Sequence, residues 1–300
     1  MNYFQGIIYT AIGSKYVEEA QISAISVKKF LPDIQITVFT DSPPSNKGAF
    51  DQIIKLESLH PKPHINKLIS MMKSPYQKTL FLDTDTFICG DISELFDLLD
   101  HFDIAMAHDR GYYDDFPEVI GVPDAFREFN QGVIVFKQSE KLHQVLVESL
   151  KWSEILFNQS GEYPYDQPPL RIALYLSDIR IAPLTHEFNC RYHSFGYLNG
   201  EVKILHGRIP GKEYNEANLN TIVVKINQET IPRVFVAGEV FVLARTKMFN
   251  INNNFPKHTA TLFQSRLVPY KLIIKRFVAI VKNEGIMGFF RRLLKKLTDT

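Results

Sequence analysis

Short apolar runs alternate with helical patterns over the first third of the chain. Four runs are typical of buried strands: residues 4–10, 36–39, 53–56 and 79–82. Between them, residues 15–30 and 65–72 carry apolar side chains every three or four positions, which predicts helices. Strands that alternate with helices in this way predict an α/β fold, with a mostly parallel sheet and helices on its faces.

The remainder of the chain continues the strand pattern and then changes character. Residues 132–136 predict another interior strand, and residues 142–156 predict a helix after it. Four later apolar runs are also expected to be strands: residues 202–205, 221–226, 233–236 and 239–244. The sequence then becomes polar and afterwards basic. We therefore expect one domain over residues 1–249, and a linker with basic amphipathic helices over residues 250–300.

Composition is ordinary for a globular protein, and only the distribution of charge adds to the pattern. The formal net charge of +1 gives no attraction toward nucleic acid. Residues 266–296 hold nine Lys or Arg and one acid, so this segment carries +8 and the rest of the chain −7. Cys89 and Cys190 are too few for a disulfide framework, and the N-terminus lacks a signal-peptide pattern. We expect a cytoplasmic protein.

The basic segment near the C-terminus is amphipathic. Apolar residues at helical spacing form one face of residues 286–297, and Arg291, Arg292, Lys295 and Lys296 form the other. Such a helix suits an anionic membrane surface, with ~1 kcal/mol from each basic residue. We expect residues 266–297 to bind the inner face of a membrane peripherally; the alternative is a helix that packs on the body.

The sharpest chemical signal is the triplet Asp83-Thr84-Asp85, directly after the run 79–82. Ligands bind beyond the carboxyl ends of parallel strands, and residues two apart in extended chain point the same way. Both carboxylates could therefore face one divalent cation, since Mg²⁺ and Mn²⁺ favour oxygen ligands. The alternative is an acidic turn that caps a helix over residues 92–99.

The run TLFLDTDTFICGDISELFDL resembles the Asp-x-Asp region of GT-A glycosyltransferases, in particular glycosyltransferase family 8, which includes glycogenin-like and lipopolysaccharide galactosyltransferase-like enzymes. Further segments resemble the family in the same order along residues 4–212: YTAIGSKYVEEA, HINKLISM, FNQGVIVF, YPYDQPPL and ILHGRIPGK. The resemblance implies a GT-A, Rossmann-like fold with a mixed, mostly parallel sheet. It also implies transfer of a sugar from a nucleotide-diphosphate donor, such as a UDP-sugar, to a glycan or lipid-linked acceptor.

The resemblance also assigns roles to residues. Asp83, Asp85 and His206 are expected to bind the metal, Mn²⁺ or Mg²⁺, although a lone histidine is more often structural. The residues expected at the donor are Thr10, Ile12, Tyr16, Lys67, Asp83, Thr84, Asn130, Gln131, Gly132, Gly207 and Lys212. The last segment departs from the family, because Ile209 stands where the family has glycine.

Asp166 and Gln167 are expected near the reacting carbon, with retention of anomeric configuration. One mechanism uses a carboxylate as the nucleophile of a double displacement. In the other, the leaving phosphate deprotonates the acceptor on the same face, and the protein orients groups and stabilises charge. We favour the second. The alternative for Asp166 is an acid in the turn before Pro168 and Pro169.

Two other functions fit parts of this pattern. A sugar-phosphate nucleotidyltransferase shares the sheet and the acidic metal site, but it needs a glycine-rich basic loop after the first strand, where only Gly13 and Lys15 are present. A catalytically degenerate, membrane-associated scaffold is the other alternative. Retention of Asp83, Asp85, Asp166 and His206 together argues against it. Residues 103–129 are expected to shape the acceptor side.

Overall fold

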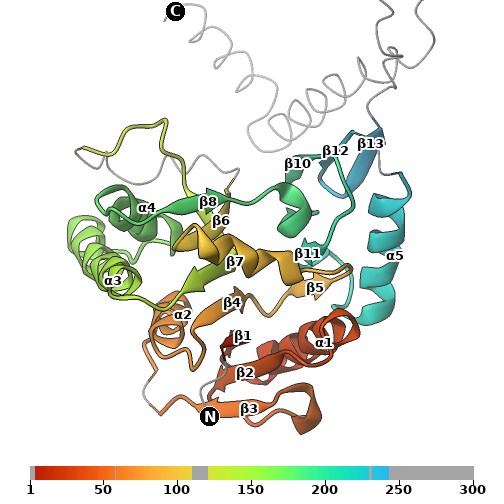
Figure 1. Cartoon of the computed structure of the whole chain (residues 1–300), viewed down its shortest axis with the longest axis horizontal. Coiled ribbons are helices and arrows are strands. Elements are labelled where there is room, and N and C mark those ends of the chain that lie inside the picture. The colour runs from red at the N-terminus through yellow and green to blue at the C-terminus, as the bar shows by residue number, and fades with distance from the viewer. Residues whose placement is uncertain (1–3, 58, 110–120, 230–231, 243–300) are drawn as a thin grey trace, which may run out of the picture. The chain divides into compact units, whose positions relative to one another are not determined.

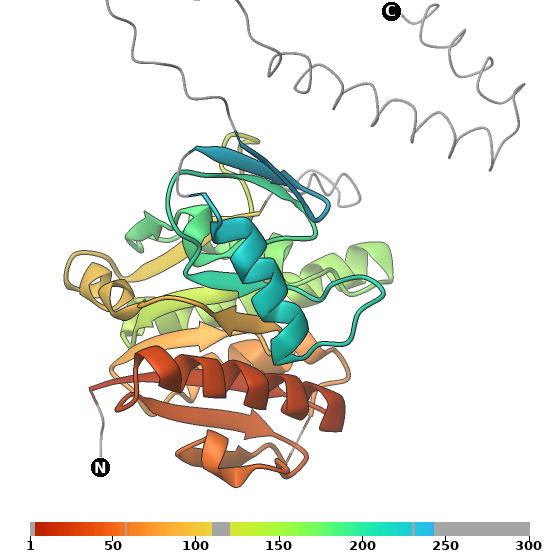
Figure 2. The same cartoon turned by 90° about the vertical axis from the view of Figure 1, so that its right-hand side faces the viewer.

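The structure is a computed structural model that describes residues 4–57, 59–109, 121–229 and 232–242 (Figures 1 and 2). These residues form a seven-stranded sheet and two three-stranded sheets. Five α-helices accompany the sheets within the described part of the chain. The predicted α/β class with a mostly parallel central sheet is confirmed.

The central sheet brings the ends of several strands to one edge. Its strands lie in the order β3 (Gln52–Lys55), β2 (Gln35–Thr40), β1 (Gln5–Ala11), β4 (Lys78–Leu82), β7 (Phe129–Lys137), β6 (Ile104–His108) and β8 (Ile181–Pro183). Only β7 runs antiparallel to its neighbours. The carboxyl end of β4 therefore lies beside the beginning of β7, where Leu82 pairs with Val133.

Helices cover both faces of this sheet (Figure 1). Along β1, Ile7 and Tyr9 pack in the same buried cluster as Val17 of α1 (Ser14–Phe30), while Ile8 points to the opposite face. That opposite face is covered by α2 (Pro63–Met72), α3 (Glu140–Ser160) and α4 (Gln167–Tyr175). Each fully buried aliphatic side chain contributes about 1.5–3 kcal/mol to the stability of the fold. Packing on both faces therefore stabilises the position of the strand ends at the site.

The chain after α4 builds the two smaller sheets. One contains β5 (Thr86–Ile88), β11 (Ile204–His206) and β9 (Cys190–Arg191), and the other β10 (Phe195–Leu198), β12 (Arg233–Val236) and β13 (Glu239–Val242). Helix α5 (Glu216–Asn227) packs on a third buried cluster between them. Because His206 pairs with Thr86 in the antiparallel β5–β11 ladder, it comes close to Asp85.

Two predicted elements are wrong. Residues 221–226 belong to α5, because Asn215 caps the helix by accepting a hydrogen bond from the Asn218 amide, 2.9 Å away, and the buried side chains recur at helical spacing. The helix expected over residues 92–99 is instead two 3₁₀ turns, Ser93–Leu95 and Asp97–Asp100. Further 3₁₀ turns are Lys47–Ala49 and His186–Phe188.

Predictions for the C-terminal part lie outside the described residues. The boundary at residue 249, the linker, the basic amphipathic helices and the membrane contact of residues 266–297 therefore stay predictions. Among the described residues, no helix is long and apolar enough to cross a membrane. Both cysteines are free thiols, Cys190 being buried.

Candidate active site

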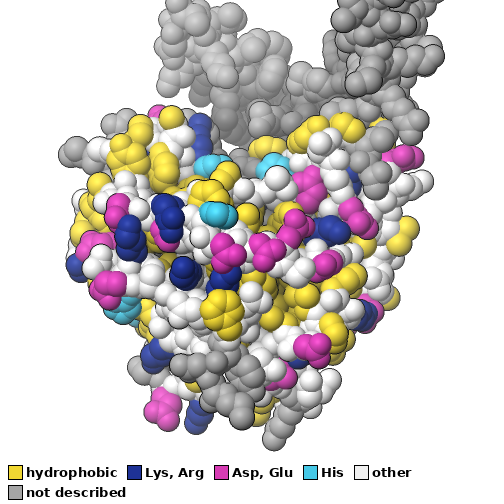
Figure 3. All heavy atoms as spheres, viewed as in Figure 1, with side chains coloured by type: hydrophobic (Ala, Val, Ile, Leu, Met, Phe, Trp, Pro, Cys, Tyr) yellow, Lys and Arg dark blue, Asp and Glu magenta, His cyan; other side chains and the backbone are white. Residues whose placement is uncertain are grey.

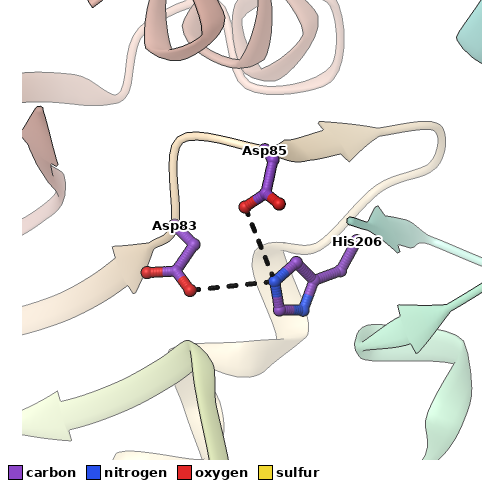
Figure 4. A group of neighbouring side chains, drawn as sticks. All are labelled: Asp83, Asp85 and His206. Atoms are coloured by element: carbon purple, nitrogen blue, oxygen red, sulfur yellow. Dashed lines mark ion pairs between the residues drawn. The ribbon is translucent and has the colours of Figure 1, made fainter. Parts of the chain in front are cut away.

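Three side chains of metal-ligand type converge where β4 ends (Figure 4). Asp83 follows β4, Asp85 precedes β5, and His206 is the last residue of β11. The Nε2 atom of His206 lies 3.7 Å from Asp83 Oδ2 and 3.7 Å from Asp85 Oδ1. One ligand atom from each of the three residues lies within 4.8 Å of the others. A single cation could contact all three.

The carboxylates of this triplet do not cap a helix. Asp91 instead accepts a hydrogen bond from the Ser93 amide at 2.9 Å, at the start of the first 3₁₀ turn. Asp83 and Asp85 therefore do not have the helix-capping role that the alternative interpretation assigned to this acidic turn.

The imidazole of His206 is oriented by a neighbouring amide. Its Nδ1 lies 2.8 Å from Asn189 Oδ1, so Nδ1 carries the proton and the lone pair of Nε2 faces the carboxylates. Burial lowers the pKa of His206, although Asp85 and Asp83 oppose this shift. A neutral imidazole held in this way is suited to bind a metal.

Gly132 of β7 leaves room for the His206 ring. A Cβ atom at position 132 would lie 2.6 Å from Nε2 of His206 and closer still to the ring carbon between the two nitrogens. The carbonyl of Gly132 also accepts a hydrogen bond from the Asp83 amide at 2.8 Å. Position 132, which corresponds to the glycine of the family's Asn-x-Gly strand, therefore requires glycine for a steric reason: a side chain there would overlap the imidazole of His206.

Lys67 of α2 joins two of the acidic residues. Its Nζ lies 2.9 Å from Asp83 Oδ1 and 3.0 Å from Asp166 Oδ2. Burial alone would lower the pKa of Lys67, but the two carboxylates outweigh it and raise the pKa. The pKa of Asp166 is lowered because Lys67 outweighs burial, whereas burial wins at Asp83 and raises its pKa. Lys67 is therefore a permanent cation in the site.

A buried hydrogen-bond network continues from His206 toward Gln167. Asn189, which holds His206, donates to Asn130 Oδ1 at 2.9 Å. Asn130 donates in turn to Asp109 Oδ2 at 3.1 Å, and the Gln167 amide donates to the same oxygen. These contacts link the metal-ligand group to Gln167, the first residue of α4, so the two groups of site residues predicted separately belong to one hydrogen-bond network.

Asp109 is the anionic centre of this network. Its side chain is 1% exposed, and Arg191 donates to both of its oxygens at 3.0 and 2.8 Å. A buried carboxylate is stable only when it is paired and hydrogen-bonded. Gln131 extends the network by donating to the backbone carbonyl of Asp166. Asp166 makes no side-chain cap to α4, so its carboxylate is committed to Lys67.

The remaining predicted donor residues lie around this centre. Thr10 and Ile12 lie at the end of β1, and Thr84 donates to Glu19 Oε2 at 3.2 Å. The Gly207 amide donates to the Asp85 carbonyl at 2.9 Å, with a φ of 105° that favours glycine. Tyr16 is 43% exposed, beneath the guanidinium of Arg208.

Lys212 is the predicted residue that the structure leaves apart. Its side chain is exposed, and the described part of the chain gives its ammonium no ion pair with the acidic residues of the site. Other charged side chains gather across the middle of the face drawn in Figure 3, where acidic, basic and histidine groups lie together.

The sequence analysis did not single out five residues of the site: Glu19, Asp109, Asn189, Arg191 and Arg208. Arg208 stands in the segment ILHGRIPGK and could have been considered as a cation near the metal. Asn189 and Arg191 carry no motif, because only the pairing of β9 with β11 brings them beside His206.

Glu128, the residue before β7, is expected to make the stability of the protein depend on pH. Burial and the nearby Asp109 raise the pKa of Glu128 to about 7, and one of its oxygens is buried without a hydrogen-bond partner among the described residues. Because the folded protein holds this proton while the unfolded chain releases it near pH 4.5, stability falls as pH rises from there to about 7. Water still reaches part of the side chain, so we expect a loss of about 1–2 kcal/mol.

Thermal unfolding at pH 5 and pH 7.5 checks this expectation. Glu128→Gln should remove much of the difference between the two pH values, and Glu94→Gln, at an exposed position, should leave it unchanged. Equal pH dependence in wild type and Glu128→Gln would contradict the assignment.

Comparison with known proteins agrees with the family and the fold predicted from the sequence. The sequence profile of glycosyl transferase family 8 matches residues 59–225. Two solved structures of the galactosyltransferase LgtC are similar, one in complex with donor and acceptor sugar analogs and one of an active-site mutant. Each has a TM-score of 0.50 and 16% sequence identity, covering 73% of this chain and 94% or 95% of LgtC. No curated protein matches by direct sequence comparison.

Fold and family profile together define a glycosyltransferase with a GT-A fold. The profile covers more than half of the chain, and the protein belongs to glycosyl transferase family 8. The predicted family, fold class and enzyme class are therefore confirmed.

Proposed function

We propose that this glycosyltransferase moves a sugar from a UDP-sugar to a hydroxyl group of a glycan or lipid-linked acceptor, with retention and with a divalent cation. The proposal rests on one observation: ligand atoms of Asp83, Asp85 and His206 lie within 4.8 Å of one another, beside the ammonium of Lys67. A diphosphate needs positive charge on both sides, and this arrangement offers a cation site and a lysine together.

The residues fit Mn²⁺ or Mg²⁺ by their chemistry. Two carboxylates supply hard oxygen ligands, and the neutral imidazole of His206 supplies a nitrogen that suits Mn²⁺ better than Mg²⁺. A cation with so few protein ligands keeps positions open for phosphate oxygens. When bound, it supplies positive charge against the charge that develops on the leaving diphosphate.

The side chains around this position orient the reaction. Lys67 holds Asp166 and Asp83 in place, and it is close enough to the cation site to contact a donor phosphate or sugar hydroxyl. Asp166 is poorly suited to attack carbon, because its carboxylate is ion-paired and its pKa is lowered. We therefore propose that the leaving phosphate takes the acceptor proton on the same face, while Asp166 and Gln167 position the sugar.

Release of nucleoside diphosphate tests the proposal. The full chain is screened with UDP-sugars by thermal shift, and the stabilising donor is then incubated with Mn²⁺, with Mg²⁺ or with a chelator. We expect UDP release with Mn²⁺ and a loss of at least about 100-fold with the chelator, since metal charge stabilises the leaving group. NMR of the product reports the anomeric configuration, and the mass of the protein after donor alone reports any sugar on Asp166.

Other results would favour other functions. Pyrophosphate release from a nucleoside triphosphate and a sugar phosphate would indicate a nucleotidyltransferase. No metal-dependent release from any donor would favour the scaffold. A mass increase of one sugar on Asp166 would contradict the same-face mechanism and support double displacement.

A further inference from the structure

Arg208 contacts one proposed metal ligand, Asp85, as Lys67 contacts the other, Asp83. Its Nη1 donates to Asp85 Oδ2 at 3.0 Å, whereas the other oxygen, Oδ1, is the one that lies 3.7 Å from His206 Nε2. Asp83 is divided in the same way, with Oδ1 on Lys67 and Oδ2 toward His206. Each carboxylate therefore gives one oxygen to a permanent cation and turns the other toward the shared centre.

A buried carboxylate of α1 fixes Arg208. Glu19 is 4% exposed, and its two oxygens accept from Nε of Arg208 at 2.8 Å and from Nη2. The guanidinium also lies 5.3 Å from the centre of the Tyr16 ring. Thr84, the residue between the two aspartates, donates to Glu19 at 3.2 Å. The Asp83–Asp85 turn is thus tied to α1 at two points.

The charges and geometry of this group suit a positioning role. Arg208 and Glu19 neutralise each other, so the guanidinium can hold Asp85 with little added repulsion toward a cation. Only the planar fork of arginine can bond Glu19 through two nitrogens and Asp85 through a third bond, and lysine cannot reproduce this. Partners of metal ligands commonly change metal affinity by about 10- to 100-fold when they are altered.

We propose that Arg208, held by Glu19, is a positioning residue that sets Asp85 with a single oxygen toward the cation. The inference rests on the proposed metal site. It makes α1, the first helix of the fold, part of the machinery that binds the cation.

Manganese binding to the full chain tests the role of Arg208. Free Mn²⁺ is measured by electron paramagnetic resonance during titration of wild type and Arg208→Lys, with Mn²⁺ alone as the probe. Arg208→Lys keeps the positive charge but loses the planar guanidinium, so we expect Mn²⁺ to bind about 10-fold more weakly. Saturating Mn²⁺ should restore much of the kcat of Arg208→Lys, which a general loss of structure would not allow.

Arg180→Lys is the matched control. Arg180 makes a similar two-nitrogen pair with Asp103, at 3.0 and 2.8 Å, at the β6–β8 side of the sheet, and its replacement should leave Mn²⁺ affinity unchanged. If Arg208→Lys does not fold, Glu19→Gln serves instead, because it keeps the shape of the pair and removes the charge that holds the guanidinium. It should also weaken Mn²⁺ binding.

The outcomes separate this inference from the function on which it rests. Wild-type Mn²⁺ affinity in Arg208→Lys, or in Glu19→Gln where that variant is used, would overturn the role of Arg208 and leave the metal site intact. A wild-type chain that binds no Mn²⁺, with or without UDP, would overturn the metal site and the inference with it.

Discussion

Replacement of Asp83 by asparagine is expected to lower kcat/KM for sugar transfer by about 10³-fold. Asparagine keeps the size of the side chain, but it removes the negative charge that faces His206 at 3.7 Å and the charge that holds Lys67 at 2.9 Å. The cation would lose a ligand at the same time as Lys67 loses a partner. We therefore expect a lower affinity for Mn²⁺ as well as a slower reaction.

Steady-state kinetics over a range of Mn²⁺ concentrations measure this effect. Asp91→Asn is the matched control, because Asp91 belongs to the same segment and accepts a hydrogen bond from the Ser93 amide at the start of a 3₁₀ turn. It should retain nearly all activity. Equal losses in the two variants, or full activity in Asp83→Asn, would show that Asp83 does not bind the cation.

The second large effect on Mn²⁺ binding is expected from replacement of Gly132 by alanine, although this adds only one methyl group. In Gly132→Ala, the added methyl group would stand 2.6 Å from Nε2 of His206 in the present structure, so the ring must turn away or β7 must shift. His206 is 6% exposed and its ring is hydrogen-bonded to Asn189, which leaves the ring little room to move. We expect at least about 100-fold weaker Mn²⁺ binding, and about 1–3 kcal/mol lower stability from overpacking.

Mn²⁺ titration and chemical denaturation of the same preparation measure both parts of this effect. Gly200→Ala is the control, because a methyl group there meets only Glu187, at an ordinary 3.8 Å. Unchanged metal affinity in Gly132→Ala would mean that His206 is not a ligand in the position described. A loss of stability with normal affinity would assign Gly132 a packing role alone.

Local pattern was enough to predict much of the central sheet and its class. Apolar runs such as residues 79–82 are buried on both faces, so their composition alone marks them as interior strands. The pattern failed at residues 221–226, where valine and isoleucine favour a strand locally. The Asn215 cap and burial of Leu219, Ile222 and Ile226 on one side stabilise a helix instead.

The site was predictable in part, for a physical reason. Asp83 and Asp85 are two positions apart at a strand end, so backbone geometry alone brings their carboxylates to one place. His206 lies far along the chain, and only the family resemblance pointed to it before the β5–β11 ladder placed it opposite Thr86. Lys67 and Asp166 were predicted as separate residues, and the 3.0 Å contact between them was not.

The sequence by itself determined the alternation of elements, the acidic pair at the end of β4 and the order of the family's segments, because each depends on residues near one another in the chain. The tertiary structure decided which groups form hydrogen bonds, which form ion pairs and which side chains exclude others by their size. Asn189 reaches His206, Glu19 reaches Arg208, and Gly132 makes room for an imidazole only after strands distant in sequence pair. Hydrogen bonds and steric exclusion act over a few ångströms, and separation along the chain does not specify distances of that size.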